Sequence, residues 1–341
     1  MLKLSVLDQS TAVVGRPEDQ AIRDTIALAR DCERLGYHRF WVSEHHNHPT
    51  IVGTAPEIIL AAIGQVTERI RIGSAGVMLP HYAPLKVAEQ FRVLDAIAPG
   101  RIDLGLGRAP GSDGKTAYAL NANAHEDAEH FPSNVRDLMA WVSGAALVDG
   151  HPFGDLVAHP KGDTAPDIWM LGTSDYGARL AAHFGLPYCF AHFITDGRGL
   201  EPAFDLYRRS YQPSPQHPEP RANVCVWALA ADTEAKAEHL FLSRAHWKLA
   251  RERGDLRAIE APEAFADVDH TDAARARLAA LRETALIGTG EQVAAKLRHL
   301  AEACGVDEIV VLTWTHDQQD RRRSYELLAE ACDLGAGAVP S

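Results

Sequence analysis

The sequence lacks long hydrophobic runs and has few cysteines. No stretch of its 341 residues approaches the roughly 18 consecutive apolar residues typical of a membrane-spanning helix, so we expect no membrane span. The first ten residues contain too short an apolar run for a signal peptide and instead predict a strand. The five cysteines are an odd number and form no CxxC pair. This pattern is typical of reduced thiols in a cytoplasmic protein.

An excess of positive charge is also absent. The 34 Lys and Arg residues face 46 Asp and Glu residues, which gives a formal net charge of −12. This balance argues against a general nucleic-acid or anionic-membrane binder, but it is compatible with a local basic pocket for a phosphate. No GxGxxG follows the first expected strand, and no GxxxxGK[ST] occurs. Neither of these two nucleotide-binding folds is therefore indicated.

The sequence does contain a regular alternation of two hydrophobic periods. Strand-like and helical segments alternate, and no two strands are joined by a tight hairpin turn. Eight strand–helix units over this length predict an α/β fold, namely a closed (β/α)8 TIM barrel rather than an open doubly wound sheet. The expected strands are 3–7, 39–42, 71–77, 101–107, 167–171, 187–191, 221–230 and 308–312. The expected helices are 17–35, 55–66, 84–98, 133–142, 174–184, 200–211, 233–253, 291–304 and 318–333.

We interpret residues 1–341 as one barrel domain with three insertions. The first, at about 109–132, reads as a polar loop, and the second, at about 144–166, as a hairpin or loop. The third, at about 254–284, is polar and weakly patterned, so we expect it to be the most mobile segment. In such a barrel the chemistry lies at the C-terminal ends of the strands. These ends fall at residue 8 and residues 43–46, 76–80, 107–111, 172–174, 192–195 and 314–316.

The fourth expected strand ends in glycine and then presents Arg108. The breaker pair Ala109–Pro110 and then Gly111 follow it. Glycine lets a ligand approach the backbone, and a guanidinium matches phosphate oxygens in a planar fork. This strand end is therefore suited to hold a phosphate. The alternative is a buried parallel strand whose Arg108 makes an ordinary salt bridge.

The segment after the fifth expected strand, residues 172–177 (GTSDYG), opens a helix. Hydroxyls, small residues and free backbone N–H groups at a helix N-terminus suit an anion, although a Ser or Thr N-cap is ordinary by itself. The indication is stronger here because Arg108 would lie on the neighbouring strand end of the same barrel face.

The segment Glu44-His45-His46-Asn47-His48 follows the second expected strand. Three histidines and a carboxylate suit a metal, acid–base work at a bound ligand, or a structural polar loop. Barrel metalloenzymes of the amidohydrolase kind have HxH on the first strand, whereas LKLSVLD has no histidine. We therefore favour a role at a bound ligand and expect no metal centre.

Small residues mark the end of the third expected strand, in SAGVMLPHYAP (residues 74–84). Ser74, Ala75 and Gly76 permit either a strained backbone or the close approach of a flat ring. Tight packing of secondary structure explains the same pattern, and both interpretations stay open.

Together these segments resemble the luciferase-like flavin monooxygenases, the bacterial luciferase family. The resemblance runs through nearly the whole chain. It implies a (β/α)8 barrel that binds FMN in reduced form, delivered by a separate NAD(P)H-dependent flavin reductase. It rests on WVSEHHN (41–47), SAGVMLP (74–80), VAEQF (87–91), PGRIDLGLGRAPG (99–111), WMLGTSDYGARLAAHFGLP (169–187) and LIGTGEQVAAKL (286–297).

The resemblance also implies roles for individual residues. Arg108 matches the arginine that grips the FMN phosphate, and Ser174 matches a serine on the same phosphate. His45 matches the histidine near the isoalloxazine ring, and the Ala75–Gly76 step matches a non-proline cis peptide beneath it. The remaining expected cofactor residues are Thr173, Tyr176, Gly177 and Met78, and the expected assistants of His45 are His46, Glu44 and His81.

The implied reaction is a monooxygenation. Reduced FMN and O2 would form a C4a-(hydro)peroxyflavin, which transfers one oxygen atom to a small organic substrate. Gly107 stands where the luciferase catalytic subunit has a reactive cysteine, Thr173 where it has a glutamate and Gly177 where it has a threonine, which argues against light emission. A homodimer is expected because the family is commonly dimeric. Two alternatives stay open, a deazaflavin-dependent hydride-transfer enzyme and a non-catalytic flavin-binding partner subunit.

Overall fold

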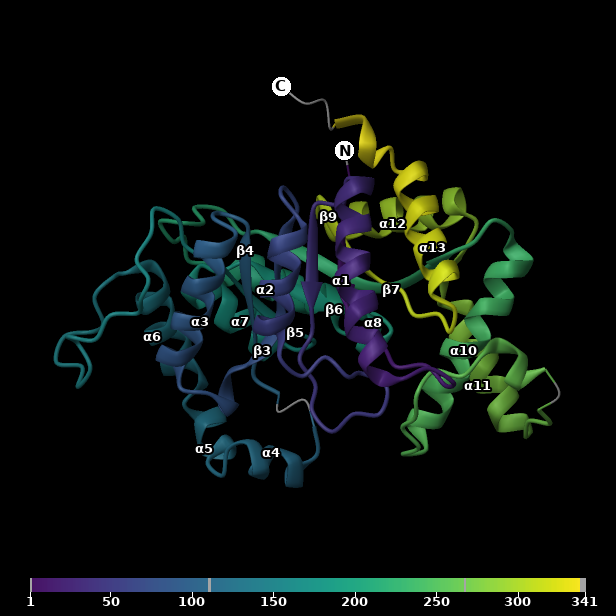
Figure 1. Ribbon diagram of the computed structural model, residues 1–341, viewed down its shortest axis with the longest axis horizontal. Coiled ribbons are helices and arrows are strands. Elements are labelled where there is room, and N and C mark those ends of the chain that lie inside the picture. Colours follow the sequence, from purple (N-terminus) through teal and green to yellow (C-terminus); the bar gives the residue numbers. More distant parts are fainter. Residues whose placement is uncertain (1, 110–111, 267, 338–341) are drawn as a thin grey trace.

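A computed structural model describes residues 2–109, 112–266 and 268–337. Eight parallel strands form a closed barrel that helices surround (Figure 1). The β6–β7, β7–β9 and β9–β1 pairings complete the ring. The TIM-barrel prediction is therefore confirmed. The barrel strands are β1 (Lys3–Asp8), β2 (Arg39–Val42), β3 (Arg71–Met78), β4 (Ile102–Gly107), β5 (Asp167–Gly172), β6 (Tyr188–Ala191), β7 (Ala222–Ala230) and β9 (Glu308–Leu312).

All nine predicted helices are present, and each boundary lies within about two residues of its predicted place. Glycines in the left-handed conformation end four of them, at Gly36, Gly144, Gly185 and Gly305, because glycine adopts this helix-ending conformation without steric cost. These helices are α1 (Glu18–Leu35), α2 (Pro56–Val66), α3 (Pro84–Ile97), α6 (Phe131–Ser143), α7 (Asp175–Phe184), α9 (Leu200–Ser210), α10 (Glu234–Glu252), α12 (Gly290–Cys304) and α13 (Gln318–Ala331).

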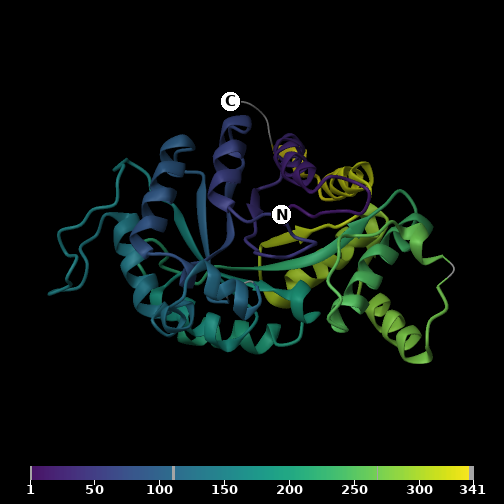
Figure 2. The same ribbon diagram turned by 60° about the horizontal axis from the view of Figure 1, so that its bottom comes forward.

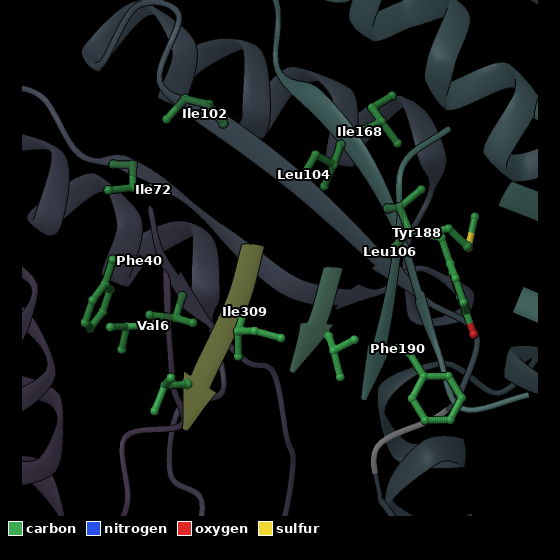
Figure 3. Close-up of a cluster of buried hydrophobic side chains, with 14 of the residues drawn as sticks. Val6, Phe40, Ile72, Ile102, Leu104, Leu106, Ile168, Tyr188, Phe190 and Ile309 are labelled. Atoms are coloured by element: carbon green, nitrogen blue, oxygen red, sulfur yellow. The ribbon is translucent and has the colours of Figure 1, made fainter. Parts of the chain in front are cut away.

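The strands bury apolar side chains on both of their faces. Outward-facing residues such as Val6, Phe40 and Leu104 pack against the surrounding helices, and Figure 3 shows part of this layer. The alternate residues, Trp41 and Trp227 among them, form a second cluster inside the barrel. Burial on both faces explains why the strand segments read as nearly continuous hydrophobic runs.

Two insertions contain helices that the sequence did not predict. The first holds α4 (Gly114–Leu120) and α5 (Ala124–Glu129), so its assignment as a loop was wrong; Asp113 caps α4 through Lys115 and Thr116 N–H groups. The third holds the 3-10 turn η2 (Pro262–Phe265) and α11 (Asp272–Glu283), capped by Thr271. Helix α11 buries only Ala274 and Leu281, which explains its weak pattern. The mobility of the third insertion stays a prediction. The second insertion is a loop in which the structure describes no strand.

Short elements complete the chain. A ninth strand, β8 (Leu286–Gly288), pairs with the last three residues of β7 outside the closed ring. Prediction missed it because three residues carry too little periodicity. The other short elements are α8 (His192–Thr195), η1 (Leu79–His81) and η3 (Leu334–Gly337). Figures 1 and 2 place α4 and α5 on one side of the barrel end and α10 and α11 on the other.

All five cysteines are buried and none forms a disulfide, as the sequence predicted. Burial raises the pKa of the Cys32, Cys189 and Cys225 thiols, which makes them poor nucleophiles. Within the described residues, no helix is both long and apolar enough to cross a membrane.

The N-terminal ends of the strands enclose a buried cluster of charges. The fully buried Arg39 donates from Nε to Glu308 Oε1 at 2.6 Å and from Nη1 to Asp103 Oδ2 at 2.7 Å. Asp103 also accepts from Arg71 and from the indole N–H of Trp41, at 2.9 Å for Trp41. This cluster closes the barrel floor and ties β2, β4 and β9 together, leaving the opposite end for chemistry.

Candidate functional site

Glu44 joins the ends of β2 and β3 at the barrel mouth. Its carboxylate is 1% exposed. It accepts hydrogen bonds from the backbone N–H of Met78 at 3.0 Å and the Tyr82 hydroxyl at 2.7 Å. His46 Nε2 lies 2.8 Å from the same carboxylate and donates to it. These contacts fix the His46 ring and support a positioning role for Glu44.

His45, next along the chain, is partly buried. Its backbone N–H donates to Gly53 O at 3.1 Å, and its Nδ1 lies 3.3 Å from the Ser43 hydroxyl. Burial, helped by the neighbouring His48, His46 and Arg251, lowers the pKa of His45 to about 4. The ring is therefore neutral at pH 7, with one nitrogen that donates and one that accepts.

The other two polar residues of this segment anchor the loop. His48 Nδ1 accepts backbone N–H groups from Thr50 and Ile51, both at 3.1 Å. Asn47, with a φ of +50°, donates to Asp113 Oδ2 at 3.2 Å at the start of α4. The three histidines thus face different partners, and no group of three metal-ligating side chains occurs within the described ranges.

The strands β3 and β4 approach closely where the small residues lie. The Ala75–Gly76 peptide bond is cis, as predicted, and the pairing register shifts by one residue between Ser74 and Val77. The Ser74 hydroxyl bonds both the carbonyl and the N–H of Gly105 at 3.1 Å. A side chain at Gly76 would meet Gly105 O at 2.6 Å. Tight strand packing therefore accounts for these glycines, and contact of this step with a flavin ring stays a prediction.

Arg108 lies at the rim without an acidic partner. Its side chain is exposed, and its guanidinium carbon lies 4.2 Å from the centre of the Tyr176 ring. No ion pair forms between Arg108 and any carboxylate of the described chain, so the salt-bridge alternative is not observed. Tyr176 holds the guanidinium in place through its ring face while leaving the N–H groups available. Pro110 and Gly111 of the same motif lie outside the described residues.

The N-terminus of α7 lies beside Arg108, because β4 and β5 are paired neighbours. Ser174 is an extended N-cap (φ −144°, ψ 165°) whose side chain makes no capping bond, so its hydroxyl is available. Thr173 is half-buried, while Gly177 is buried against Tyr188. Asp175 in the first turn opposes an anion, so the attraction of this site depends on Arg108.

The structure brings the predicted residues into two groups at the barrel mouth. Glu44, His45, His46 and Met78 form one group at the β2 and β3 ends, and Arg108 with residues 173–177 forms the other at the β4 and β5 ends. The Tyr82 hydroxyl was not predicted from the sequence, although Tyr82 directly follows His81.

Arg244 of α10, which is 5% exposed, was not predicted from the sequence either. The sequence feature that distinguishes Arg244 is a charged residue on the apolar stripe of this helix, which includes Leu240, Phe241 and Trp247.

One sizeable cavity lies apart from both groups. It has a volume of about 370 Å³ and lies between α10 and the third insertion, lined by His246, Trp247, Phe265 and His270 among others. None of the predicted cofactor or catalytic residues lines it. We therefore place the candidate site by its chemistry at the strand ends, and not by this cavity.

The low pKa of His45 predicts a loss of stability in acid. Its ordinary value is 6.5, so as the pH falls from about 6.5 to about 4 the unfolded chain takes up this proton before the folded one. The free energy of unfolding should therefore fall by about 2–3 kcal/mol from this group. Urea unfolding at pH 7.5 and pH 4.5 measures it. In His45→Gln this share of the pH dependence should disappear, and an unchanged pH dependence would contradict the prediction.

Comparisons with known proteins place the chain in a family. A family model described as luciferase-like monooxygenase matches residues 2–308. A Bacillus subtilis (strain 168) protein named N-acetyl-S-alkylcysteine monooxygenase is 35% identical over 336 residues, 97% of this chain and 98% of that protein. The crystal structure of apo-MsnO8 is 36% identical, with a TM-score of 0.89 over 98% of this chain and 99% of that one.

A more distant solved structure is the oxygenating constituent of 3,6-diketocamphane monooxygenase from Pseudomonas putida in complex with FMN. It has a TM-score of 0.71 at 20% identity and covers 97% of both chains. At this identity the likeness shows the fold alone.

Proposed function

The chain belongs to the luciferase-like monooxygenase family, and from this premise we propose that it is a flavin-dependent monooxygenase that uses reduced FMN and O2 to oxygenate a small organic substrate. The observation that carries the proposal is Arg108, an exposed cation without a described carboxylate partner, beside the free N-terminus of α7. A guanidinium and unsatisfied N–H groups on one rim suit a dianionic phosphate.

The residues present fit a flavin phosphate. Arg108 would bind it through its planar fork, and Ser174 and Thr173 would donate hydroxyl hydrogen bonds. Tyr176 and Gly177 lie in the first turn of α7, and their backbone N–H groups would also donate to the phosphate. The distant FMN complex supports the choice of FMN, because a protein of this fold holds that cofactor. Ala75, Gly76 and Met78 at the end of β3 would line the ring.

The proposed chemistry divides between cofactor and protein. Reduced FMN, when bound, would supply the two electrons that activate O2, so that one oxygen atom goes to the substrate and the other leaves as water. His45, neutral at pH 7, would donate a hydrogen bond to the reacting group or accept its proton. Glu44 and His46 would hold the β2 loop in register with β3. The third insertion would exclude water from the mouth.

Partners and substrate class also belong to the proposal. A separate NAD(P)H-dependent flavin reductase would deliver reduced FMN, and a homodimer is the expected assembly. The relative named N-acetyl-S-alkylcysteine monooxygenase makes thioethers the first substrates to screen.

The experiment is an anaerobic titration with reduced FMN, followed by mixing with ¹⁸O₂ in the presence of candidate thioethers. Mass spectrometry should find one ¹⁸O atom in the product. Tight flavin binding without ¹⁸O incorporation would instead favour a non-catalytic flavin-binding subunit. Oxidation of an alcohol without oxygen, using a deazaflavin, would favour the hydride-transfer alternative.

Replacing Arg108 tests the phosphate site directly. The variant Arg108→Ala should raise the Kd for FMN about 10- to 100-fold, because hydrogen bonds to a charged group contribute about 1.5–3 kcal/mol. Isothermal titration measures this change, and riboflavin, which lacks the phosphate, should bind both proteins equally. The exposed Arg179, in the second turn of α7, offers a control for the loss of a nearby cation, Arg179→Ala. An unchanged FMN affinity in Arg108→Ala would refute the phosphate role.

A further inference from the structure

Arg244 is a buried cation on the face of α10 that packs onto the barrel. Its side chain is 5% exposed, and its Nη2 makes one long hydrogen bond, at 3.5 Å, to Phe193 O. No carboxylate of the described chain forms an ion pair with it. A buried charge without a counter-ion is costly, so its presence needs a physical reason.

Three tryptophans surround the guanidinium. Its central carbon lies 4.7 Å from the ring centre of Trp314, 5.3 Å from that of Trp227 and 5.5 Å from that of Trp247. Indole faces attract a cation and hold it without neutralising its charge. The arrangement therefore presents a fixed positive charge within apolar walls.

The surrounding charges leave the surroundings of Arg244 with an excess of positive charge. Asp196 is an acidic group that acts on Arg244, but Lys248 already pairs with it and Arg277 lies 3.8 Å from it. Burial, together with the repulsion of Arg251, lowers the pKa of Arg244 to about 9, which still leaves it charged at pH 7. An anion arriving here would relieve an existing electrostatic cost.

The surroundings of Arg244 are connected to the loop of residues 44–48, which carries the three histidines. The Trp247 indole N–H donates to the Thr50 hydroxyl at 2.8 Å, and its ring centre lies 6.5 Å from that of His48. His48 in turn lies 5.8 Å from His45 between ring centres. A small molecule held by Arg244 would thus be anchored on the side of the mouth that carries His45.

We propose that Arg244 and its tryptophan walls form a substrate subsite for a small organic carboxylate. A cavity of about 40 Å³ beside Arg244 is lined also by Trp227, Lys248 and the Asp196 that pairs with Lys248, but not by Trp247 or Trp314, and it has room for a head group but not for a whole substrate. The planar fork of the guanidinium matches a carboxylate, and the indoles suit the apolar chain attached to it. The inference rests on the proposed oxygenase function, for which it names the substrate class.

Calorimetric titration compares hexanoate with hexanamide, first on the protein without flavin and then on the protein saturated with FMN. Hexanoate should bind at least about tenfold tighter than the amide, because only the acid pairs with the guanidinium. In Arg244→Met this preference should vanish. In Arg244→Lys, which keeps the charge but not the fork, part of it should remain. The control Lys236→Met removes a cation from the same helix, where Lys236 pairs with Asp320, and should change nothing.

Three results would overturn the subsite. They are equal binding of acid and amide in both states of the unmodified protein, an unchanged preference in Arg244→Met, and weaker FMN binding in that variant as its only effect. If Arg244→Met does not fold, an undiminished preference in Arg244→Lys overturns it instead. Because the titration needs no turnover, an intact preference with no ¹⁸O incorporation would refute the oxygenase and leave the subsite standing.

Discussion

Replacing His45 by glutamine should lower turnover about 100-fold or more while the Kd for reduced FMN changes by less than about threefold. The neutral imidazole has a donor and an acceptor nitrogen, held by the backbone bond to Gly53 and the Ser43 hydroxyl. Glutamine keeps hydrogen-bonding groups of similar reach but has no ring nitrogen that can accept a proton. Stopped-flow oxidation with product analysis separates binding from turnover.

The matched control is His48→Asn, in the same loop. Its amide oxygen can replace the Nδ1 atom that accepts from Thr50 and Ile51, so turnover should remain within about fivefold. If His48→Asn loses as much activity as His45→Gln, the effect reflects loop disorder and not the imidazole of His45. Full coupled activity in His45→Gln would remove that residue from the mechanism.

The barrel could be predicted because its determinants are local. Strand and helix periods read directly from short windows, and left-handed glycines such as Gly36 and Gly305 mark helix ends. The same reasoning failed for α11, which buries two residues, and for β8, which has only three. Elements that bury little surface leave little pattern, and α11 and β8 contribute Leu281 and Leu286 to the cavity beside Arg244.

The candidate site was predictable residue by residue only where chemistry and strand ends coincide. Arg108 and the Glu44–His46 segment follow strands, so barrel topology alone places them on one face. Arg244 lies within a 19-residue helix and becomes unusual only when Trp227 of β7 and Trp314, after β9, join Trp247 of the same helix around it. Such an environment is a property of tertiary structure that no local window contains.

The barrel floor should prove as sensitive as the mouth. Replacing Arg39 by methionine should lower the free energy of unfolding by about 3–5 kcal/mol, because removing one partner of a buried ion pair leaves an uncompensated charge. Glu308 would keep only the Ser5 hydroxyl, at 2.6 Å. Methionine retains much of the packing against Trp169, 4.9 Å from the guanidinium carbon. Urea unfolding measures the change.

Two further variants separate charge from packing in this cluster. Arg71→Met removes a cation from the same Asp103, but Arg71 is 24% exposed and Arg39 still pairs with that carboxylate, so the loss should stay below about 2 kcal/mol. Adding Glu308→Gln to Arg39→Met should recover part of the stability, since the uncompensated charge is then gone. A double variant no more stable than Arg39→Met would instead assign the loss to packing around Trp169. That outcome would mean that the indole layer, and not the ion pairs, holds β2, β4 and β9 in register beneath the site.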